Sequence, residues 1–594
     1  MEESIMKKTS DTRIITKIMF RLLPVQILLA AVGAVNGIVS SYFASNYVGV
    51  DAMSAVGLYS PFNMLLMALA TMMAGGAAIL CGKYLGQNKQ DRLNNVFSVD
   101  LAASALIAIV FTALFVVLSL FDLTGFITGD EAVRPLFNRY LLGQAIGVFP
   151  FILGNQLPAF LSLENREKRT MTASIIYIIC NVLLNYLFVQ VLGLEAFGLA
   201  LASSIGLWIF LAVQAQYFFS KKAHLRASAK NLRWGESGDI IKTGIPGAAS
   251  NGYQTLRGFI LNHLIEIYVG SIGISAFAAV DNVMRIFWSV PIAMLAVSRL
   301  MISVSYGEED RRTLSDIMRV MLKKYLPLMS VICIGIIACA EPMTRLFYQD
   351  PSADVYKMTV WGLCLIPICM PFSIIYMHYV CYGQASGKTV LVHILSLLDG
   401  VVCVAGFAAL TIRFLGMNGV YLGSVFNGVV TTLVILLYAW IKNKRRPKNM
   451  DDLMAFPDSF GADESERMDL TVRSMDEVVG ISQAVQRFCL EKGIDRRRAY
   501  LAGLSMEEMA GNIVDHGFAK DKKRHSIDVR VVRKDDDVIL RLRDDCVPFD
   551  PGERQSLAES DDPSKNIGIR MVFKIARDVE YQNILGLNVL TVRI

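Results

Sequence analysis

The chain has 594 residues, of which 54% are hydrophobic and only 19% are charged, and its net charge is +6. One water-soluble core does not need so much apolar sequence, so the composition excludes an ordinary soluble protein. The ten cysteines stand singly and form no C-x-x-C pair. The sequence therefore suggests neither a zinc site nor a disulfide framework.

Residues 1–14 are polar, and apolar runs of 20 or more residues begin at about residue 15. Each run meets the length needed to cross about 30 Å of hydrocarbon. The first run is too long for the core of a signal peptide, so we expect it to be retained as a membrane span. The runs predict twelve helical spans, at roughly 15–45, 55–82, 96–122, 134–162, 170–192, 196–220, 239–269, 273–304, 317–341, 355–384, 388–413 and 418–442.

The two halves of this region repeat each other at one constant offset. Tyr47-Val48-Gly49 recurs as Tyr268-Val269-Gly270. Gly and Pro residues fix turns, kinks and close helix contacts. Because such residues recur at one offset, we expect that the region is one duplicated unit. We predict two six-helix repeats, 15–220 and 239–442, joined by a cytoplasmic loop at 221–238. The same offset relates Gly86 to Gly307, Pro150 to Pro371, Gly198 to Gly419 and Ser203 to Ser424.

Lysine and arginine gather in the loops that follow the even-numbered spans. The loop after the first span has none, and the loop after the third span is acidic. The positive-inside rule then places both termini in the cytoplasm of a multi-pass inner-membrane protein. The basic residues are Lys83, Lys89 and Arg92 after span two, Arg166, Lys168 and Arg169 after span four, and Lys221, Lys222, Arg226, Lys230 and Arg233 after span six.

Several stretches carry a family resemblance. They are VNGIVSSYFASNYVGVDAMSAVGLYSPF at 35–62, KYLGQNKQDRL at 83–93, NVLLNYLFVQVLGLEAFGLALASS at 181–204 and GIPGAAS at 244–250. Residues 15–442 thereby resemble the multidrug and toxic compound extrusion (MATE) transporters. The resemblance implies two six-helix bundles embedded in the lipid bilayer and an alternating-access mechanism. It also implies export of amphipathic organic cations against a Na⁺ or H⁺ gradient.

The chain departs from this family where ion coupling takes place. Many members have aspartates at the positions of Asn36 and Asn185. An asparagine does not carry a proton at physiological pH, although its carbonyl oxygen can ligate sodium. Pro150 and Pro371 stand at equivalent kinks of the two halves and are further candidate transport residues.

Other ionisable residues fall inside predicted spans, where such groups usually face a cavity or a partner. Asp281 and Arg285 are four residues apart, so they share one helix face. They form either a salt bridge that holds two helices or part of a cation site. Asp399, with apolar neighbours, is the most isolated charge, and we expect it to contribute to coupling.

The apolar character ends after Trp440. Residues 443–466 form a basic juxtamembrane segment and a linker. From 467 to 594 the pattern is that of a soluble α/β domain. Its periodicity predicts strands at 468–472, 526–533, 536–544, 578–583 and 588–594, helices at 475–492, 496–517 and 568–577, and a polar loop at 550–566.

Three segments of this domain carry a second resemblance. They are LSMEEMAGNIVDHGF at 504–518, LRDDCVPFDP at 542–551 and KNIGIRM at 565–571. Glu508 and Asn512 project from one helix face because they are four residues apart. Together with Asp544 and Gly568 they resemble the GHKL (Bergerat) ATP-binding fold, and the anti-sigma-factor serine kinases in particular.

The resemblance gives each residue a role. Asn512 would offer its amide oxygen to the Mg²⁺ of ATP, and Glu508 would act as the catalytic base. Asp544 would accept a hydrogen bond from the adenine amino group, and Gly568 would let backbone N–H groups approach phosphate. Loop 550–566 would be the lid. Further nucleotide-binding candidates are His516 and Phe549; the departures from the family pattern are Cys546, Pro548 and Asn566.

These resemblances imply a cation-coupled multidrug exporter with a cytosolic ATP-binding domain that regulates it or signals its state. One alternative is a membrane-anchored anti-sigma-type serine kinase whose membrane part only senses a ligand. Another is a flippase for lipid-linked substrates. Serine kinase activity stays open. A STAS-type or sigma-factor protein is a possible partner, and no nucleic-acid partner is expected.

Overall fold

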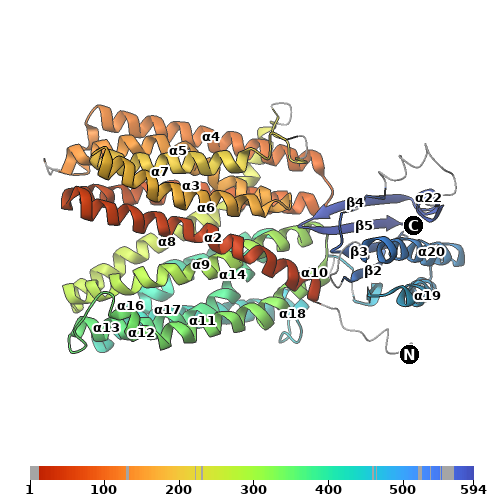
Figure 1. The fold of residues 1–594 in the computed structure, drawn as a ribbon. Helices are drawn as coiled ribbons and strands as arrows, with labels where there is room; N and C mark the ends of the chain where they lie inside the picture. The colour runs from red at the N-terminus through yellow and green to blue at the C-terminus, as the bar shows by residue number, and fades with distance from the viewer. Residues whose placement is uncertain are drawn as a thin grey trace. The chain divides into compact units, whose positions relative to one another are not determined.

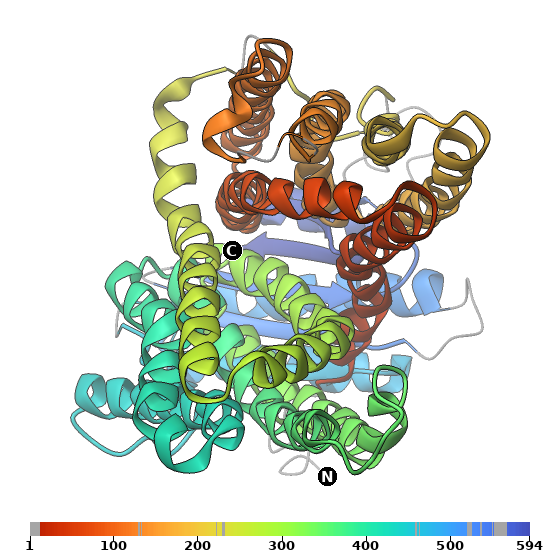
Figure 2. The same cartoon turned by 90° about the vertical axis from the view of Figure 1, so that its left-hand side faces the viewer.

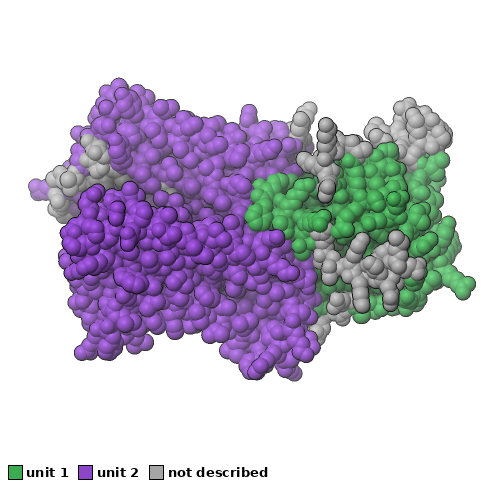
Figure 3. All heavy atoms as spheres, turned by 60° about the horizontal axis from the view of Figure 1, so that its bottom comes forward, with its two compact units in different colours: residues 1–21, 309–312, 456–594 green, residues 22–308, 313–455 purple. Residues whose placement is uncertain are grey.

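The computed structural model describes residues 12–128, 131, 133–220, 223–228, 232–457, 460–462, 464–518, 525–534, 537–548, 550–551 and 567–594. The chain divides into two compact units (Figure 3). Unit 1 comprises Met1–Arg21, Glu309–Arg312 and Phe456–Ile594, and unit 2 comprises Leu22–Glu308 and Thr313–Ala455. Each unit is described by itself below.

Unit 2 is built from long helices, and all twelve segments predicted to span the membrane are helical. Figures 1 and 2 show the helices of the first half gathered on one side of this unit and those of the second half on the other. The first half contains α2 (Arg13–Phe43, whose first residues belong to unit 1), α3 (Val50–Gly86), α4 (Gln90–Leu120), α5 (Val133–Leu163), α6 (Glu167–Asn185) and α7 (Glu195–Ala215). The second half contains α8 (Ser237–Tyr268), α9 (Ser271–Gly307), α10 (Arg311–Val320), α11 (Leu326–Ala338), α12 (Ala340–Thr344), α13 (Asp354–Leu365), α14 (Met370–Ala385), α15 (Thr389–Leu397), α16 (Cys403–Leu415) and α17 (Met417–Asn443).

The duplication is visible in α3 and α9, which are both 37 residues long and begin and end at equivalent positions. Each is preceded by a glycine with positive φ, Gly49 at 123° and Gly270 at 85°. A side chain would strain that backbone, which explains why glycine occurs at both positions. At the other end, a methyl group on Gly86 would overlap the carbonyl oxygen of Val304, and one on Gly307 would overlap that of Lys83. The two helices therefore meet backbone to backbone at their ends.

Length and hydropathy mark eleven of the described helices as able to cross a membrane. The predicted seventh span, which forms α8, is not among them. It is helical over 32 residues but carries polar groups along its length, including Arg257, His263 and Glu266. Its role as a span stays a prediction.

Short 3₁₀ and π segments interrupt spans in both halves. A 3₁₀ segment, η7 (Ile366–Cys369), separates α13 from α14; Pro367 lies within it and Pro371 is the second residue of α14. Proline has no N–H to donate, so the α-helical ladder breaks there. The equivalent Pro150 lies inside the uninterrupted α5. Three π-helical segments interrupt other spans: η3 (Tyr186–Val191), η6 (Met321–Tyr325) and η8 (Leu398–Val402).

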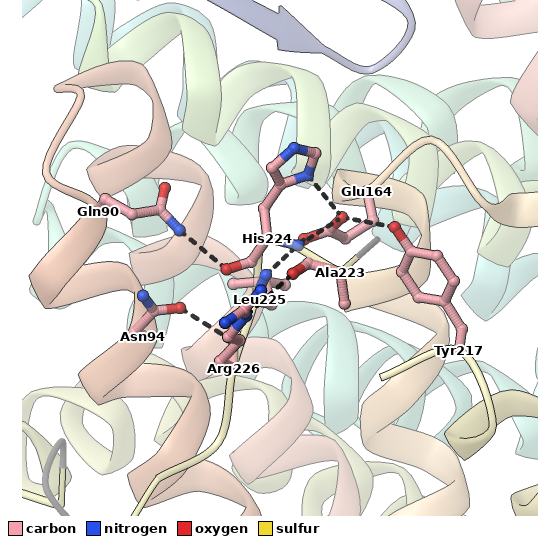
Figure 4. Close-up of polar contacts among 8 residues, drawn as sticks. All are labelled: Gln90, Asn94, Glu164, Tyr217, Ala223, His224, Leu225 and Arg226. Atoms are coloured by element: carbon pink, nitrogen blue, oxygen red, sulfur yellow. Dashed lines mark hydrogen bonds and ion pairs between the residues drawn. The ribbon is translucent and has the colours of Figure 1, made fainter. Parts of the chain in front are cut away.

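The connection between the two halves is held by Glu164, whose side chain is 4% exposed. Its carboxylate accepts hydrogen bonds from the backbone N–H groups of His224 (3.1 Å) and Leu225 (2.7 Å) and from the Tyr217 hydroxyl (2.8 Å) (Figure 4). Asn94 Oδ1 accepts from the N–H of Arg226 at 3.1 Å. The described part of the connection is therefore fixed to the first half by side chains that satisfy its backbone donors.

The segment predicted as a juxtamembrane linker contains a short helix, α18 (Met450–Met454), within unit 2. Asp452 accepts from Arg445 at 2.9 Å and from the N–H of Lys448 at 3.0 Å. The backbone bond from Lys448 makes the largest contribution to lowering the pKa of Asp452. Lys388 Nζ donates to the carbonyl oxygens of Met454 and Ala455 at 3.0 and 3.1 Å.

The C-terminal part of unit 1 is a five-stranded antiparallel sheet, ordered β1-β2-β3-β5-β4, with helices packed on one face (Figure 1). The alternating residues Val529, Val531, Leu540 and Leu542 are buried in the core with the helices. The strands are β1 (Arg467–Val472), β2 (Ile527–Lys534), β3 (Asp537–Asp544), β4 (Asp578–Ile584) and β5 (Leu587–Arg593); the helices are α19 (Met475–Glu491), α20 (Arg496–Asn512) with the π segment η10 (Ile513–Gly517), and α22 (Ile567–Ile575). These elements confirm the α/β prediction, with boundaries that differ by one or two residues.

Candidate functional site

The end of α20 and the start of α22 meet at the predicted nucleotide site. A methyl group on Gly568 would overlap the carboxylate of Glu508, so these two residues touch. Asn512 is half-buried and donates its Nδ2 to the Glu508 backbone carbonyl at 2.7 Å. That bond leaves the amide oxygen of Asn512 as an acceptor for a hard cation. Three of the residues predicted from the sequence are thus brought together.

Asp544 ends β3 and is 3% exposed. It accepts hydrogen bonds from the N–H of Cys546 at 2.9 Å and from Asn588 Nδ2 at 2.8 Å, and both bonds end on Oδ1. Oδ2 receives neither bond, so it is the oxygen suited to a ligand's amino group. Burial raises the pKa of Asp544, against the opposing effect of the hydrogen bonds from Asn588 and Cys546.

Asn588 is a site residue that sequence reasoning missed. It lies on β5, is 4% exposed, and its Oδ1 accepts from the Tyr581 hydroxyl at 2.8 Å and from Asn583 Nδ2 at 2.9 Å. These bonds fix its amide so that Nδ2 points to Asp544. No motif marks an asparagine inside a strand, so only the pairing of β5 with β3 reveals this role.

Two nucleotide candidates cannot be placed against this cluster. Phe549 lies outside the described residues, as does most of the predicted lid 550–566, including Asn566. His516 lies in η10 with an exposed side chain. No contact places it at the site.

His525, Asp545 and Cys546 bring three potential metal-ligand atoms within 4.8 Å of one another. His525 Nδ1 lies 2.7 Å from Asp545 Oδ1, and Lys17 forms an ion pair with the other oxygen of Asp545. Burial opposes ionisation of Asp545, but the bonds from Lys17 and His525 outweigh it and lower its pKa. Lys17 thus already supplies a positive charge to this carboxylate.

In the first half of unit 2, Asn36 and Asn185 belong to one polar cluster. Asn36 Oδ1 accepts from Asn181 Nδ2 at 3.0 Å and from Ser203 Oγ at 3.1 Å. Asn185 Nδ2 donates to the Asn181 carbonyl at 2.8 Å, and its buried Oδ1 has no hydrogen-bond partner among the described residues. Sequence pattern did not mark Asn181 or Ser203 as site residues, although Asn181 lies one helical turn before Asn185.

In the second half, Asp399 lies in the π segment η8, and π segments occur often at functional sites. Its Oδ1 accepts from Asn427 Nδ2 on α17 at 2.8 Å, and its backbone carbonyl accepts from Arg257 on α8 at 3.3 Å. The prediction that Asp399 is an isolated charge was wrong, because polar groups from two other helices contact Asp399. Local sequence shows only the neighbours on one helix.

Asp281 and Arg285 form the ion pair that their spacing predicts, with 2.8 Å between Arg285 Nε and Asp281 Oδ2. The pair lies on one helix, α9, and both side chains are about half exposed or more, at 49% and 67%. The alternative of a salt bridge that joins two helices was therefore wrong for this pair.

Asp100 is an ionisable residue that the sequence analysis overlooked inside the predicted third span. It lies on α4 with 0% exposure, and neither carboxylate oxygen has a hydrogen-bond partner among the described residues. Burying an unpaired polar group is costly, so this position is unusual in the first half. A lone aspartate in an apolar helix was a sufficient signal to single it out.

Both parts of the chain match known protein families. A family model described as MatE matches residues 26–187 and 246–409, and one described as histidine kinase-like ATPase domain matches residues 472–594. A probable multidrug resistance protein NorM from Photorhabdus laumondii subsp. laumondii is 22% identical over 371 residues, which is 61% of this chain and 80% of that protein. A protein with the same description from Geobacillus kaustophilus is 21% identical over 234 residues, 38% of this chain, and this chain spans 50% of its length.

A solved structure described as the outward-facing conformation of a multidrug resistance MATE family transporter of the MOP superfamily superposes with a TM-score of 0.66. It is 20% identical, and the match covers 72% of this chain and 96% of that chain. At this identity the likeness shows the fold of the membrane part. Because the family match covers more than half of the chain, this multi-pass membrane protein belongs to the MatE family and carries a C-terminal histidine kinase-like ATPase domain.

Proposed function

We propose that the chain is a cation-coupled exporter of amphipathic organic cations, with a cytosolic domain that binds Mg-ATP and regulates export or signals its state. The observation that carries the proposal is the union in one chain of a MatE fold with a cluster of Glu508, Asn512 and Gly568 and a buried Asp544 at the end of β3. Since ATP is a cytoplasmic ligand, the proposal puts the ATPase-like domain, and with it both termini, on the cytoplasmic side of the inner membrane.

The residues present fit a bound nucleotide. The buried acceptor Asp544 Oδ2 suits the adenine amino group, and Asn512 Oδ1 suits Mg²⁺. The start of α22 offers backbone N–H groups to phosphate, and the Glu508 carboxylate lies against Gly568 at the same end of the helix. ATP would supply a phosphoryl group for transfer or only a binding signal. Glu508 is the residue on this helix face that could hold the proton of a nucleophile.

Ion coupling is proposed at two places. Asn36 and Asn185 present neutral amide oxygens, and the unsatisfied Oδ1 of Asn185 favours a cation such as Na⁺. Asp399 is the carboxylate of the second half that lies among polar groups from other helices, and it would bind Na⁺ or H⁺. Asp281 and Arg285, on an exposed face of α9, are a second candidate for contact with a cationic substrate.

Purified full-length chain in proteoliposomes tests the proposal. Ethidium flux is measured under imposed Na⁺ or H⁺ gradients, with and without Mg-ATP, and ATP binding is measured on the same sample by calorimetry. Gradient-driven flux together with ATP binding supports a regulated exporter. Binding and phosphorylation of an added serine substrate, without flux of any tested cation, would instead support the sensor kinase.

A further inference from the structure

The proposed nucleotide site and two segments from the membrane part of the chain meet at three consecutive residues. These are Arg543, Asp544 and Asp545, at the end of β3. Asp544 is the proposed adenine acceptor. Side chains alternate along a strand, so Arg543 projects from the opposite face of the sheet. Inside unit 1, Arg543 contacts Asp310, and Asp545 contacts Lys17.

Asp310 has a 0% exposed side chain and forms ion pairs with two arginines of the sheet. Its Oδ2 lies 2.9 Å from Arg543, and its Oδ1 pairs with Arg530 of β2. Arg530 also holds Asp469 of β1 at 2.7 Å, and Asp469 accepts from Arg312 at 2.6 Å. The segment Glu309–Arg312 is thus bound through a continuous chain of alternating charges.

The arginine face of the sheet takes one acid, Asp469, from its own strands and a second, Asp310, from outside them. Arg530 lies directly opposite Arg541 in the strand register, and Arg543 is two residues further along the same face. Like charges in that arrangement repel one another. Asp310 supplies a compensating negative charge, and the arginines hold its pKa well below the ordinary value although burial alone would raise it. The face is therefore built to receive this aspartate.

The bound segment follows the end of a long helix. Glu309 adopts a left-handed conformation with φ of 52°, and Asn88, at the equivalent position of the first repeat, has φ of 54°. This conformation is common just after the end of a helix. The segment contains Glu309 and Asp310 of the connection between α9, which ends at Gly307, and α10, whose first two residues, Arg311 and Arg312, complete it.

The second segment is the start of α2, from Arg13 to Arg21. Arg13, Lys17 and Arg21 are four residues apart and so form one stripe on the helix. Lys17 pairs with Asp545, and Arg21 donates to the carbonyl oxygen of Leu585 at 2.5 Å. α2 belongs to the first repeat of the transporter and α9 to the second.

We propose that the end of β3 is a coupling surface between the nucleotide site and the transporter. Nucleotide bound at Asp544 changes how firmly this surface holds residues 13–21 of the first repeat and residues 309–312 of the second. The inference rests on the proposed nucleotide site. Alternating access requires the two repeats to move relative to each other. The ATPase-like domain holds a segment of each repeat at residues next to its proposed nucleotide. The movement of the repeats would therefore depend on whether nucleotide is bound.

Hydrogen exchange of the full-length chain in lipid nanodiscs, with and without saturating Mg-ATP, tests the coupling. We expect Mg-ATP to change exchange in peptides covering 305–315 and 13–21 by about fivefold or more, the usual size of an allosteric coupling. Asp310→Asn should abolish the change at 305–315 while ATP still binds. The matched control is Glu309→Gln, because the neighbouring pair of Glu309 with Lys534 is about half exposed and contributes little.

A charge exchange separates coupling from damage to the fold. Asp310→Arg alone should lose the response, and Asp310→Arg combined with Arg543→Asp should recover at least part of it. Saturable ATP binding with unchanged exchange at both segments would overturn the coupling and leave the nucleotide site standing. Absence of ATP binding would overturn both. Equal loss of the response in Asp310→Asn and Glu309→Gln would also overturn the assignment to Asp310.

Discussion

Asp544→Asn is expected to reverse the base preference of the proposed nucleotide site. In the native site Oδ1 accepts from both Cys546 N–H and Asn588 Nδ2, and an amide replacing the carboxylate would keep these bonds by placing its oxygen there. Its NH₂ group would then occupy the position of Oδ2 and face the adenine amino group, donor against donor. A hydrogen bond to a charged group contributes about 1.5–3 kcal/mol, so ATP affinity should fall by about 10- to 150-fold.

The same variant should bind inosine triphosphate better than the native chain does, because that base presents a carbonyl oxygen where adenine has its amino group. Calorimetry on the full-length chain with ATP and with inosine triphosphate measures both affinities. A thermal melt with each nucleotide provides a second measurement, since a ligand at 100 times its Kd stabilises by about 2.7 kcal/mol. Unchanged ATP affinity with an unchanged order of the two nucleotides would refute the assignment of Asp544.

Four further outcomes are expected. ATP binding should weaken on acidification at a pH above the ordinary range of an aspartate, because the raised pKa of Asp544 lets it take up a proton earlier, and Asp544→Asn should show no such step in a calorimetric pH series. Glu508→Gln should strengthen Mg-ATP binding several-fold, since a carboxylate about 4 Å from a phosphate costs about 1 kcal/mol even in water, and it should stop any phosphoryl transfer; weaker binding would contradict this placement. Asp399→Asn should abolish gradient-driven flux at normal expression, and unchanged flux would exclude a coupling role. Glu164→Ala should lower stability by about 2–3 kcal/mol in a detergent melt because it leaves backbone donors of the connection unpaired, whereas Glu195→Gln, at an exposed ion pair, should change little.

Local pattern was sufficient for the helices, the strands and part of the nucleotide site. Glu508 and Asn512 share a helix face because of their spacing alone, and the glycines at 49 and 270 mark equivalent turns because no other residue takes that backbone conformation easily. The order of the motifs then indicated that Asp544 and Gly568 belong with them. The helix-face and glycine predictions were confirmed because each depends on neighbours within a few residues along the chain, whereas the place of Asp544 in the site stays a prediction.

Contacts between distant segments could not be predicted in this way. Asp399 looked isolated because its partners, Asn427 and Arg257, come from other helices. Asn588 reaches Asp544 only because β5 pairs with β3. Asp281 and Arg285 did pair as their spacing implied, but only the fold shows that the pair stays on one exposed helix.

The sequence by itself determined the class of protein: long apolar runs predict membrane helices, a constant offset predicts the repeat, and three ordered motifs predict an ATP-binding fold. The tertiary structure decided which charges meet. Lys17 lies in the predicted first span and Asp310 in the loop after the predicted eighth span, and sequence pattern singled out neither. In the structure Asp310 binds Arg543 and Lys17 binds Asp545, on either side of Asp544. Sequence periodicity reports the face on which a side chain lies, whereas a buried ion pair depends on which faces the folded chain brings together.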